Sequence, residues 1–201
     1  MQEIYAFIDV QNTASTTKKL LGFIIDWRKL CDYLNKKWRC NKENIFVYAG
    51  IDEGDDVATQ EFDSLLQAGY TIRNKRIFSY KKPDKNITVK CVHCGKDNVE
   101  VVDMGYNRKS NCDVDLTVDA MEKAGPDKVF LLFTGDGDFE YLVRSVINKG
   151  TKVHLVSSNA GVRNLDLVTK RFSTRFKKII RENRGTVNFI NIDSWKMKIR
   201  K

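Results

Sequence analysis

Short apolar runs rich in β-branched and aromatic residues alternate along this chain with segments whose apolar residues recur at helical spacing. The run Val-Phe-Leu-Leu-Phe at residues 129–133 is continuously apolar, as is typical of a strand buried on both faces of a sheet. Strands that alternate with helices indicate βαβ units, which right-handed crossovers join into a parallel sheet. The pattern therefore predicts an α/β fold with a mostly parallel central sheet and helices on both faces.

The expected strands are short and rich in β-forming residues, and they cover residues 4–8, 45–49, 70–78, 129–133, 152–156 and 187–192. The expected helices have apolar residues three and four positions apart, and they cover residues 26–38, 57–67, 114–123, 139–148 and 165–180. The last of these is expected to be helical, either continuous or broken. Asp113 is placed as the N-cap of the third helix.

Residues 81–111 interrupt this alternation. The segment is polar and carries the run Cys-Val-His-Cys-Gly-Lys at residues 91–96. Two pieces of alternating polarity, residues 86–90 and 99–103, lie on either side of that run. We expect a β-hairpin inserted into a single domain that spans residues 1–201, with the cysteine pair near the hairpin tip.

Composition excludes several classes of protein. Hydrophobic residues make up 42% of the chain and are spread along it, as in a protein with a packed core. Spanning a bilayer takes roughly 20 consecutive apolar residues, and no run here approaches that length. The chain opens without the features of a secretion signal, so we expect a cytoplasmic protein with no membrane segment. Five cysteines, an odd number, argue against a disulfide framework.

The net charge of +9 lies at the C-terminal end. Residues 163–201 hold 12 Lys and Arg but only 3 Asp and Glu, so the remainder of the chain is neutral on balance. Such a basic segment of the same domain suits contacts with phosphate, although a solvated helix face has the same composition. The candidates for nucleic-acid contacts are Arg163, Lys170, Arg171, Arg175, Lys177, Lys178 and Arg181.

Four aspartates lie next to predicted strand ends or helix starts. Asp9 follows the first strand, Asp136 and Asp138 follow the strand at 129–133, and Asp113 begins the helix after the insertion. Open α/β sheets bind ligands outside the carboxyl ends of their strands. Carboxylates gathered there repel one another unless a cation lies among them, and Mg²⁺ and Mn²⁺ prefer such ligands. Taken singly, each aspartate is also consistent with a turn or a helix cap.

Three segments together resemble the NYN domain family, including its LabA-like branch. They are Phe-Ile-Asp-Val-Gln-Asn at 7–12, Asn-Cys-Asp-Val-Asp-Leu-Thr-Val-Asp-Ala-Met at 111–121, and residues 131–158, which contain Thr-Gly-Asp-Gly-Asp-Phe. The resemblance implies a PIN-like three-layer α/β/α fold and a ribonuclease, most simply an endonuclease, that uses Mg²⁺ or Mn²⁺ to hydrolyse single-stranded RNA. Some relatives are regarded mainly as regulators, so the alternative is a catalytically silent module that binds nucleic acid.

The resemblance also assigns individual residues. The implied metal-binding and catalytic acids are Asp9, Asp113, Asp136 and Asp138. Asp119 matches a recurrent helix acid and is a further candidate metal ligand. Asn12 and Thr134 occupy supporting positions. Val10 stands where glycine is common in the family, and the cysteine insertion is not part of the core pattern.

The pair Cys91 and Cys94 resembles one zinc knuckle, whereas structural zinc takes four ligands. Three alternatives stay open. They are a four-cysteine site shared across a homodimer, a site of Cys91, Cys94 and Cys112 with an unknown fourth ligand, or no metal. His93 lies inside the pair, where it is too cramped to bind the same ion together with both cysteines.

Other chemistries find little support. His154 lies within a predicted strand and fits a structural role, and the chain contains no phosphate-binding Gly-x-x-x-x-Gly-Lys loop. Lys152 begins its predicted strand rather than ending it, which disfavours a phosphatase or phospho-acceptor domain. Phe172, Phe176 and Trp195 are candidates for stacking on bases, although the spacing of the first two fits a core better.

Overall fold

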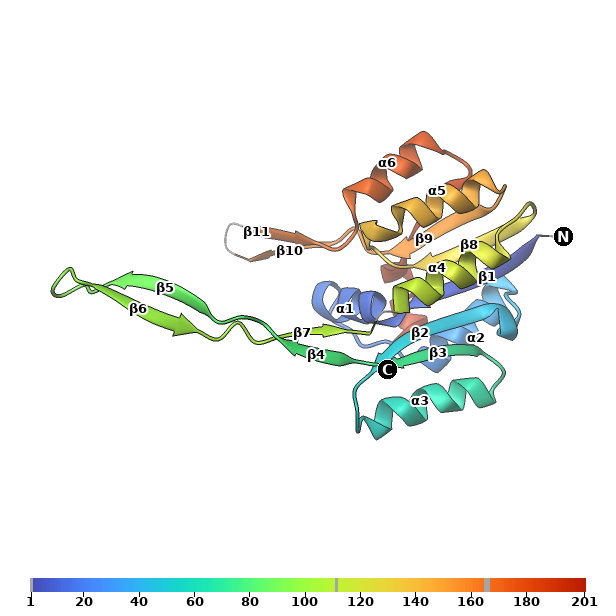
Figure 1. The fold of residues 1–201 in the computed structure, drawn as a ribbon. Helices are drawn as coiled ribbons and strands as arrows, with labels where there is room; N and C mark the ends of the chain where they lie inside the picture. Colours follow the sequence, from blue (N-terminus) through green and yellow to red (C-terminus); the bar gives the residue numbers. More distant parts are fainter. Residues whose placement is uncertain (1, 111, 165–166) are drawn as a thin grey trace.

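The computed structural model describes residues 2–110, 112–164 and 167–201, without side-chain detail for residues 108–109, 162–164 and 167–169. Figure 1 shows a central sheet with helices on both faces and two hairpins that extend from the body. The three-layer α/β architecture expected from the sequence is thereby confirmed, and so is the inserted hairpin.

The central sheet has six parallel strands within the described residues, in the order β12-β9-β8-β1-β2-β3. The strands are β1 Glu3–Asp9, β2 Ile45–Ile51, β3 Thr71–Arg76, β8 Lys128–Phe133, β9 Lys152–Ser157 and β12 Val187–Asn191. The chain builds outward from β1 to β3 on one side, then returns to add β8, β9 and β12 on the other. The resulting switch point between β1 and β8 is where such sheets bind ligands.

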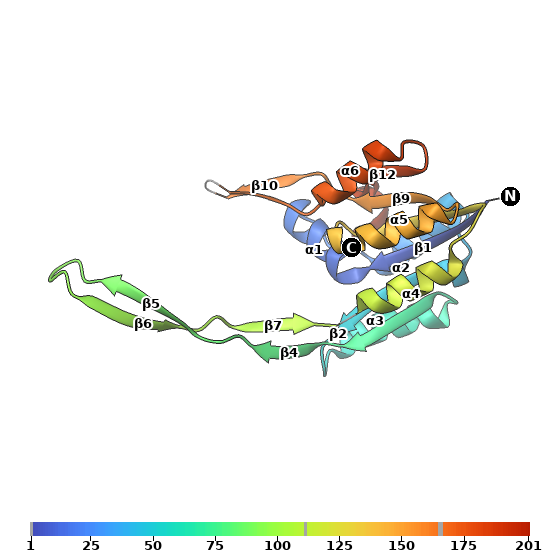
Figure 2. The same cartoon turned by 45° about the horizontal axis from the view of Figure 1, so that its top comes forward.

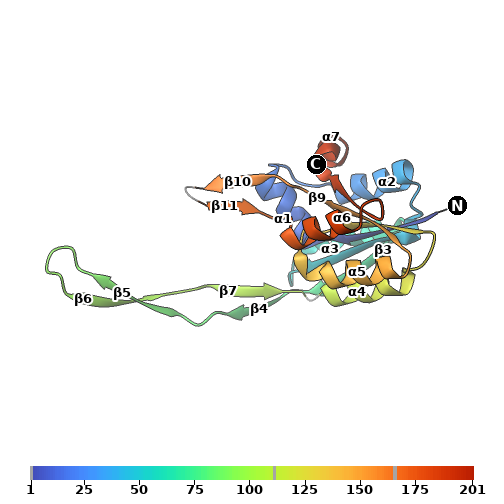
Figure 3. The same cartoon turned by 90° about the horizontal axis from the view of Figure 1, so that it is seen from above.

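Two separate hydrophobic cores flank the sheet, one on each face. Figure 3 shows α2 and α7 on one side and α4 and α5 on the other. One face is covered by α1 Val10–Leu20, α2 Trp27–Trp38, α3 Asp56–Gln67 and α7 Lys196–Ile199, and the other by α4 Cys112–Lys123, α5 Glu140–Asn148 and α6 Thr174–Glu182. Alternate residues of β1 serve the two cores, with Ile8 on the first and Phe7 on the second. None of the helices in the described ranges is long and apolar enough to cross a lipid bilayer.

Two hairpins project from the end of the sheet at which the strands finish, because β4 follows β3 and β10 follows β9 (Figure 1). In the longer hairpin, β4 Phe78–Lys81 pairs with β7 Tyr106–Lys109, and β5 Lys85–Lys90 pairs with β6 Asp97–Val102. We call this segment, residues 78–109, the arm. It reaches well beyond the body in the views of Figures 1 and 2. The shorter hairpin consists of β10 Gly161–Asn164 and β11 Leu167–Lys170.

Helix α1 is absent from the sequence expectations because it lacks an apolar stripe. Its first residue is the apolar Val10, but the other side chains that it buries are Thr13, Thr16 and Thr17. Asp9 caps it, since the Asp9 carboxylate accepts a hydrogen bond from the backbone N–H of Asn12. The cap and the neighbouring sheet stabilise a helix that hydrophobic periodicity alone does not reveal.

The helix expected over residues 165–180 is wrong in its first half. Residues 165–166 lie outside the described part, Leu167–Lys170 is strand β11, and the helix begins only at Thr174 with Ser173 as its N-cap. Asp113 is likewise not an N-cap, because α4 already begins at Cys112.

The aromatic candidates for stacking on bases belong to the interior. Phe172, Phe176 and Trp195 are all buried, the first two in the core on the α5 face and Trp195 in the opposite core. Their side chains therefore stabilise packing and do not present a surface to nucleic acid.

Candidate active site

The ends of β1 and β8 are joined by a short chain of hydrogen bonds. The hydroxyl of Thr134, which follows β8, donates to the carboxylate of Asp9 at 3.3 Å. The same hydroxyl oxygen accepts a hydrogen bond from the backbone N–H of Asp136 at 3.2 Å. The switch point of the sheet thus brings the carboxylate of Asp9 and the backbone of Asp136 to one hydroxyl, although the two residues lie far apart in the sequence.

Asn12 holds the loop after β8, which carries Asp136 and Asp138. Its side-chain oxygen accepts a hydrogen bond from the backbone N–H of Gly135 at 2.8 Å. Within the loop, the Asp136 carboxylate accepts from the backbone N–H of Asp138 at 3.0 Å and so caps the short 3₁₀ helix Gly137–Phe139. Asn12 and Thr134 therefore both fix the loop after β8 against the end of β1.

The electrostatics of this region disfavour negative charge. Burial raises the pKa of Asp9 to about 6, and the charges of Asp113 and Asp136 add to this effect, while the hydrogen bonds from Asn12 and Thr134 oppose it. The pKa of Asp113 is also raised, by partial removal from water and then by the charges of Asp136 and Asp138. These acids are close enough to repel one another, which is the situation that a divalent cation relieves.

The donor set suits a hard cation, but its members are not drawn together into a finished ligand cage. Among the described residues, no group of three or more His, Cys, Asp or Glu side chains could hold a metal ion as they stand. Asp136 and Asp138 are exposed, so their side chains have room to rotate. The carboxylate oxygens of Asp9, Asp113 and Asp136 are the ligand type that Mg²⁺ and Mn²⁺ prefer.

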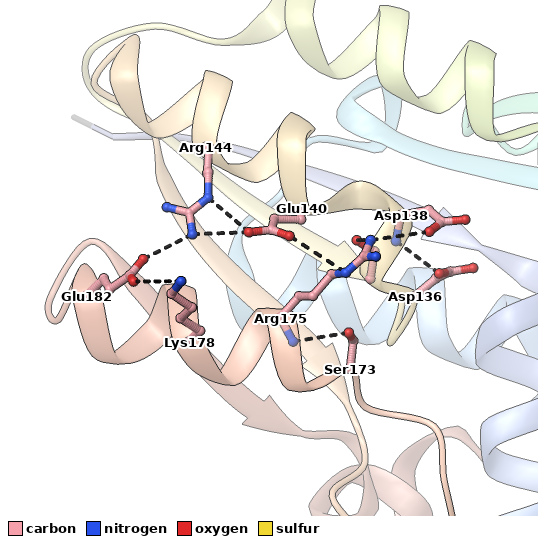
Figure 4. A network of polar contacts seen from close by, with 9 residues as sticks. Asp136, Asp138, Glu140, Arg144, Ser173, Arg175, Lys178 and Glu182 are labelled. Carbon is pink, nitrogen blue, oxygen red and sulfur yellow. Dashed lines mark hydrogen bonds and ion pairs between the residues drawn. The ribbon is translucent and has the colours of Figure 1, made fainter.

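We call the loop after β8, which carries Asp136 and Asp138, the acidic loop. A row of ion pairs links it to helix α6 (Figure 4). The guanidinium of Arg175 lies 3.7 Å from the Asp138 carboxylate and 3.9 Å from that of Glu140. Arg144 bridges Glu140 and Glu182 at 3.1 and 3.0 Å. Because Arg175 is well exposed, the pair with Asp138 contributes little to stability, and a phosphate group can replace it as the partner of Arg175.

Gly135 and Gly137 permit a close approach by the segment that leads into α6. Neither glycine has a positive φ. A Cβ atom on Gly135 would lie 2.2 Å from the carbonyl oxygen of Arg171, and one on Gly137 would lie 2.4 Å from the Ser173 hydroxyl oxygen. The backbone N–H of Ser173 also donates to the Gly135 carbonyl at 3.0 Å.

Two cavities open on either side of the acidic loop. The first has a volume of about 350 Å³ and is lined by residues that include Asn12, Asp136, Lys170, Arg171 and Ser173. The Nε of Arg171 is buried without a hydrogen-bond partner within the described structure. The positive charges of Lys170 and Arg171 make the first cavity suitable for an anionic group.

The second cavity is smaller, about 230 Å³, and more apolar. Its walls are formed by Val114, Thr117, Val118 and Phe139, with Asp113 and Asp138 at the same opening. Ser173 in the first cavity and the two valines in the second have no signal in the sequence, because only the packing of α6 and α4 places them beside the acids.

Two further helix acids form their own ion pairs. Asp119 accepts a hydrogen bond from the Tyr48 hydroxyl at 2.8 Å and pairs with Arg73 at 3.2 Å. Asp115 pairs with Lys75 at 2.7 Å. The structure thus engages Asp119 with β2 and β3, while Asp113 faces the acidic loop.

The basic candidates divide by position. Lys170 and Arg171 line the first cavity, Arg175 meets the acidic loop, and Lys178 pairs with Glu182. Lys177 and Arg181 lie on α6. The side chain of Arg163 lies outside the described part of the structure.

The structure separates the three cysteines considered as one zinc site. Cys112 is buried in the core where α4 begins, whereas Cys91 and Cys94 occupy the turn between β5 and β6 at the far end of the arm (Figure 2). Backbone N–H groups of Cys94 and His93 lower the pKa of Cys91 by donating hydrogen bonds to its sulfur. A site that combines Cys91, Cys94 and Cys112 of one chain is incompatible with this arrangement.

His154 has the environment of a structural residue. It lies on β9 with its ring 5.6 Å from that of Trp38, and burial lowers its pKa.

Comparison with known proteins agrees with this architecture. A family model described as the NYN domain matches residues 3–176. The chain is 24% identical over 167 residues to the low amplitude and bright protein LabA of Synechococcus elongatus, across 83% of this chain and 80% of that protein. The crystal structure of a protein of unknown function from Vibrio parahaemolyticus shares the fold, with a TM-score of 0.59 and 21% identity over 95% of this chain and 93% of that one. The chain therefore belongs to the NYN domain family, a family of PIN-like nucleases.

Proposed function

We propose that this protein is a divalent-metal-dependent ribonuclease that cleaves single-stranded RNA in an active site formed by Asp9, Asp113, Asp136 and Asp138. The observation that carries the proposal is that the Thr134 hydroxyl joins the Asp9 carboxylate to the backbone of Asp136 at the switch point of the sheet, close enough for the charge of Asp136 to act on Asp9. Membership of a nuclease family supports it. Mutual repulsion of the acids supports it as well, since repelling carboxylates are a cost that binding of a cation removes.

The proposed metal ligands differ in how firmly the protein holds them. Asp9 is held by the hydrogen bonds from Asn12 and Thr134, so its position is preorganised. Asp136 and Asp138 are exposed and can turn toward a cation and a phosphate. A bound Mg²⁺ or Mn²⁺ supplies Lewis acidity, which lowers the pKa of a coordinated water and offsets charge on the phosphoryl group under attack.

The two cavities provide a path for a polynucleotide across the acidic loop. In the first, Lys170 and Arg171 neutralise a backbone phosphate beside Asp136. In the second, Val114 and Val118 form apolar walls for a neighbouring base. A base can enter such a cavity only when it is unstacked, which favours a single-stranded substrate.

Incubation of end-labelled single-stranded RNA with Mg²⁺ or Mn²⁺, with and without EDTA, tests the proposal. We expect internal fragments in the presence of metal and none with EDTA. Asp136→Asn is expected to lower the cleavage rate at least about 100-fold and to leave RNA binding largely intact. The matched control is Asp115→Asn, which removes an acid outside the cluster and should cleave like the wild type. Cleavage by Asp136→Asn at the wild-type rate refutes the assignment.

The competing function is a binding module that does not cut. The exposed ion pair of Arg175 with Asp138 favours it, because the arginine already neutralises one acid of the loop. In that case the wild type binds RNA with a steep salt dependence and yields no product with either metal. The same assay therefore separates the two functions.

A further inference from the structure

The arm ends in a turn with the geometry of one half of a zinc site. The backbone N–H of Cys91 donates to the carbonyl of Lys96, and that of Gly95 donates to the carbonyl of Cys91, both at 2.9 Å. Gly95 has a φ of 71°, which closes the turn after the second cysteine. The N–H groups of His93 and Cys94 point at the Cys91 sulfur. Donors aimed at sulfur in this way stabilise a metal-bound thiolate.

The described part of the chain supplies no further ligands for this turn. Cys31, Cys40 and Cys112 are buried in the body, and the arm carries its tip away from them (Figure 1). Among the described residues, no third His, Cys, Asp or Glu side chain joins these two cysteines in a group that could hold a metal ion. Structural zinc is tetrahedral and takes four ligands, so two thiols complete a site only with two more from another molecule.

The strands below the tip also lack a partner. In the described arm, nearly every residue of β5 and β6 is exposed, including Val99 at 66% and Val101 at 67%. Ile87 and Val89 are partly exposed on the opposite face. An isolated two-stranded ribbon is only marginally stable in water, so a metal at its tip and a second ribbon beside it stabilise it.

We propose that the arm tips of two copies of this chain share one structural Zn²⁺, which is bound by Cys91 and Cys94 of each copy. The arrangement is symmetric, since each copy contributes the same pair. Four thiols release four protons on binding, which leaves a site with two net negative charges. Lys90, directly before Cys91, and Lys96, two residues after Cys94, offset this charge in both copies.

The proposal is independent of RNA cleavage, because the tip and the acidic loop lie in different parts of the molecule (Figure 1). Full-length protein is to be purified in the presence of Zn²⁺, and its zinc content and molar mass measured by plasma mass spectrometry and light scattering. We expect a dimer with one zinc for every two chains. Titration of the metal-free protein with Co²⁺ alone should saturate at the same ratio, with the absorption of a tetrahedral four-thiolate site.

The variant that tests the site replaces both thiols, Cys91→Ser with Cys94→Ser. It should lose zinc and become a monomer whose body stays folded by circular dichroism, because the tip contributes nothing to either core. His93→Gln is the matched control and should keep both zinc and the dimer. One zinc per monomer, absence of zinc, a dimer that survives loss of the cysteines, or a dimer dissolved by a thiol reductant but not by a chelator would each overturn the proposal.

Discussion

The hydroxyl of Thr134 lies 3.3 Å from the carboxylate of Asp9 and donates a hydrogen bond to it across two neighbouring strands. This contact favours the charged form of Asp9, whereas burial and the nearby acids favour the neutral form, and the second influence is stronger. The folded protein thus holds Asp9 in a position that costs stability whenever the carboxylate is charged. Stability is commonly lower at sites that are arranged for binding or catalysis.

Replacement of Asp9 by Asn should stabilise the metal-free protein at pH 7.5. Asn is as good a helix N-cap as Asp, so the change removes mainly the charge. Because the folded-state pKa of Asp9 is raised from 3.8 to about 6, the folded state binds the proton more tightly than the unfolded state does. Burial of Asp9 therefore costs the wild type least stability below pH 4, where the carboxyl is protonated. The free energy of unfolding falls as the pH rises from about 4 to 6. Urea unfolding in EDTA should show a gain of about 1–3 kcal/mol at pH 7.5 and little change at pH 4.

The same pair of proteins reports on the cation. Mn²⁺ that binds the folded state should raise the melting temperature of the wild type and have a much smaller effect on Asp9→Asn. An equal stabilisation by Asn at both pH values would contradict the raised pKa.

Gly135→Ala should destabilise the loop between the acids and α6. The added methyl group would lie 2.2 Å from the Arg171 carbonyl oxygen, so the backbone must move, at a cost of about 1–3 kcal/mol. Gly125→Ala is the matched control, because its Cβ meets nothing within 4 Å and its φ is not positive. Thermal unfolding of both variants distinguishes them, and equal melting temperatures would count against the close approach.

Arg175→Gln is expected to weaken RNA binding without much effect on stability. The residue is exposed and its ion pairs are long, so the free energy of unfolding should change by less than about 1 kcal/mol. If Arg175 contacts phosphate, the slope of log K against log salt should fall in magnitude by about 0.7, the value for one contact with a single strand. Lys36→Gln, an equal change of charge on α2, should leave the slope unaltered, and identical slopes for both variants would exclude the contact.

Asp119→Asn should lower the free energy of unfolding but have little effect on the affinity for Mn²⁺. The carboxylate accepts from Tyr48 and pairs with Arg73, and loss of a charged, partly buried acceptor costs about 1–3 kcal/mol. Tyr48→Phe removes the donor and should also destabilise, without an effect on Mn²⁺ affinity. Isothermal titration with Mn²⁺ checks this, and a large loss of affinity in Asp119→Asn alone would make Asp119 a ligand.

Local pattern was sufficient for most elements and for the positions of the acids. The run at 129–133 identifies its strand because continuous apolar residues rarely occur elsewhere in a soluble chain, and β8 coincides with it. Helix α1 escaped detection because its buried threonines do not register as apolar. The helix predicted over residues 165–180 was wrong in its first half because the basic and apolar residues of β11 and α6 together have the spacing of one amphipathic helix.

The sequence by itself determined which residues carry carboxylates, thiols and positive charge, and that several acids follow strands. Only the tertiary structure decided that β1 and β8 are neighbours, so that the hydrogen bond between Thr134 and Asp9 spans 125 positions of the chain. It also directed Arg175 to the acidic loop, Asp119 to Tyr48, and the cysteine pair away from Cys112. The physical reason is that periodicity and capping act within a few residues, whereas strand order and helix packing depend on burial across the whole chain.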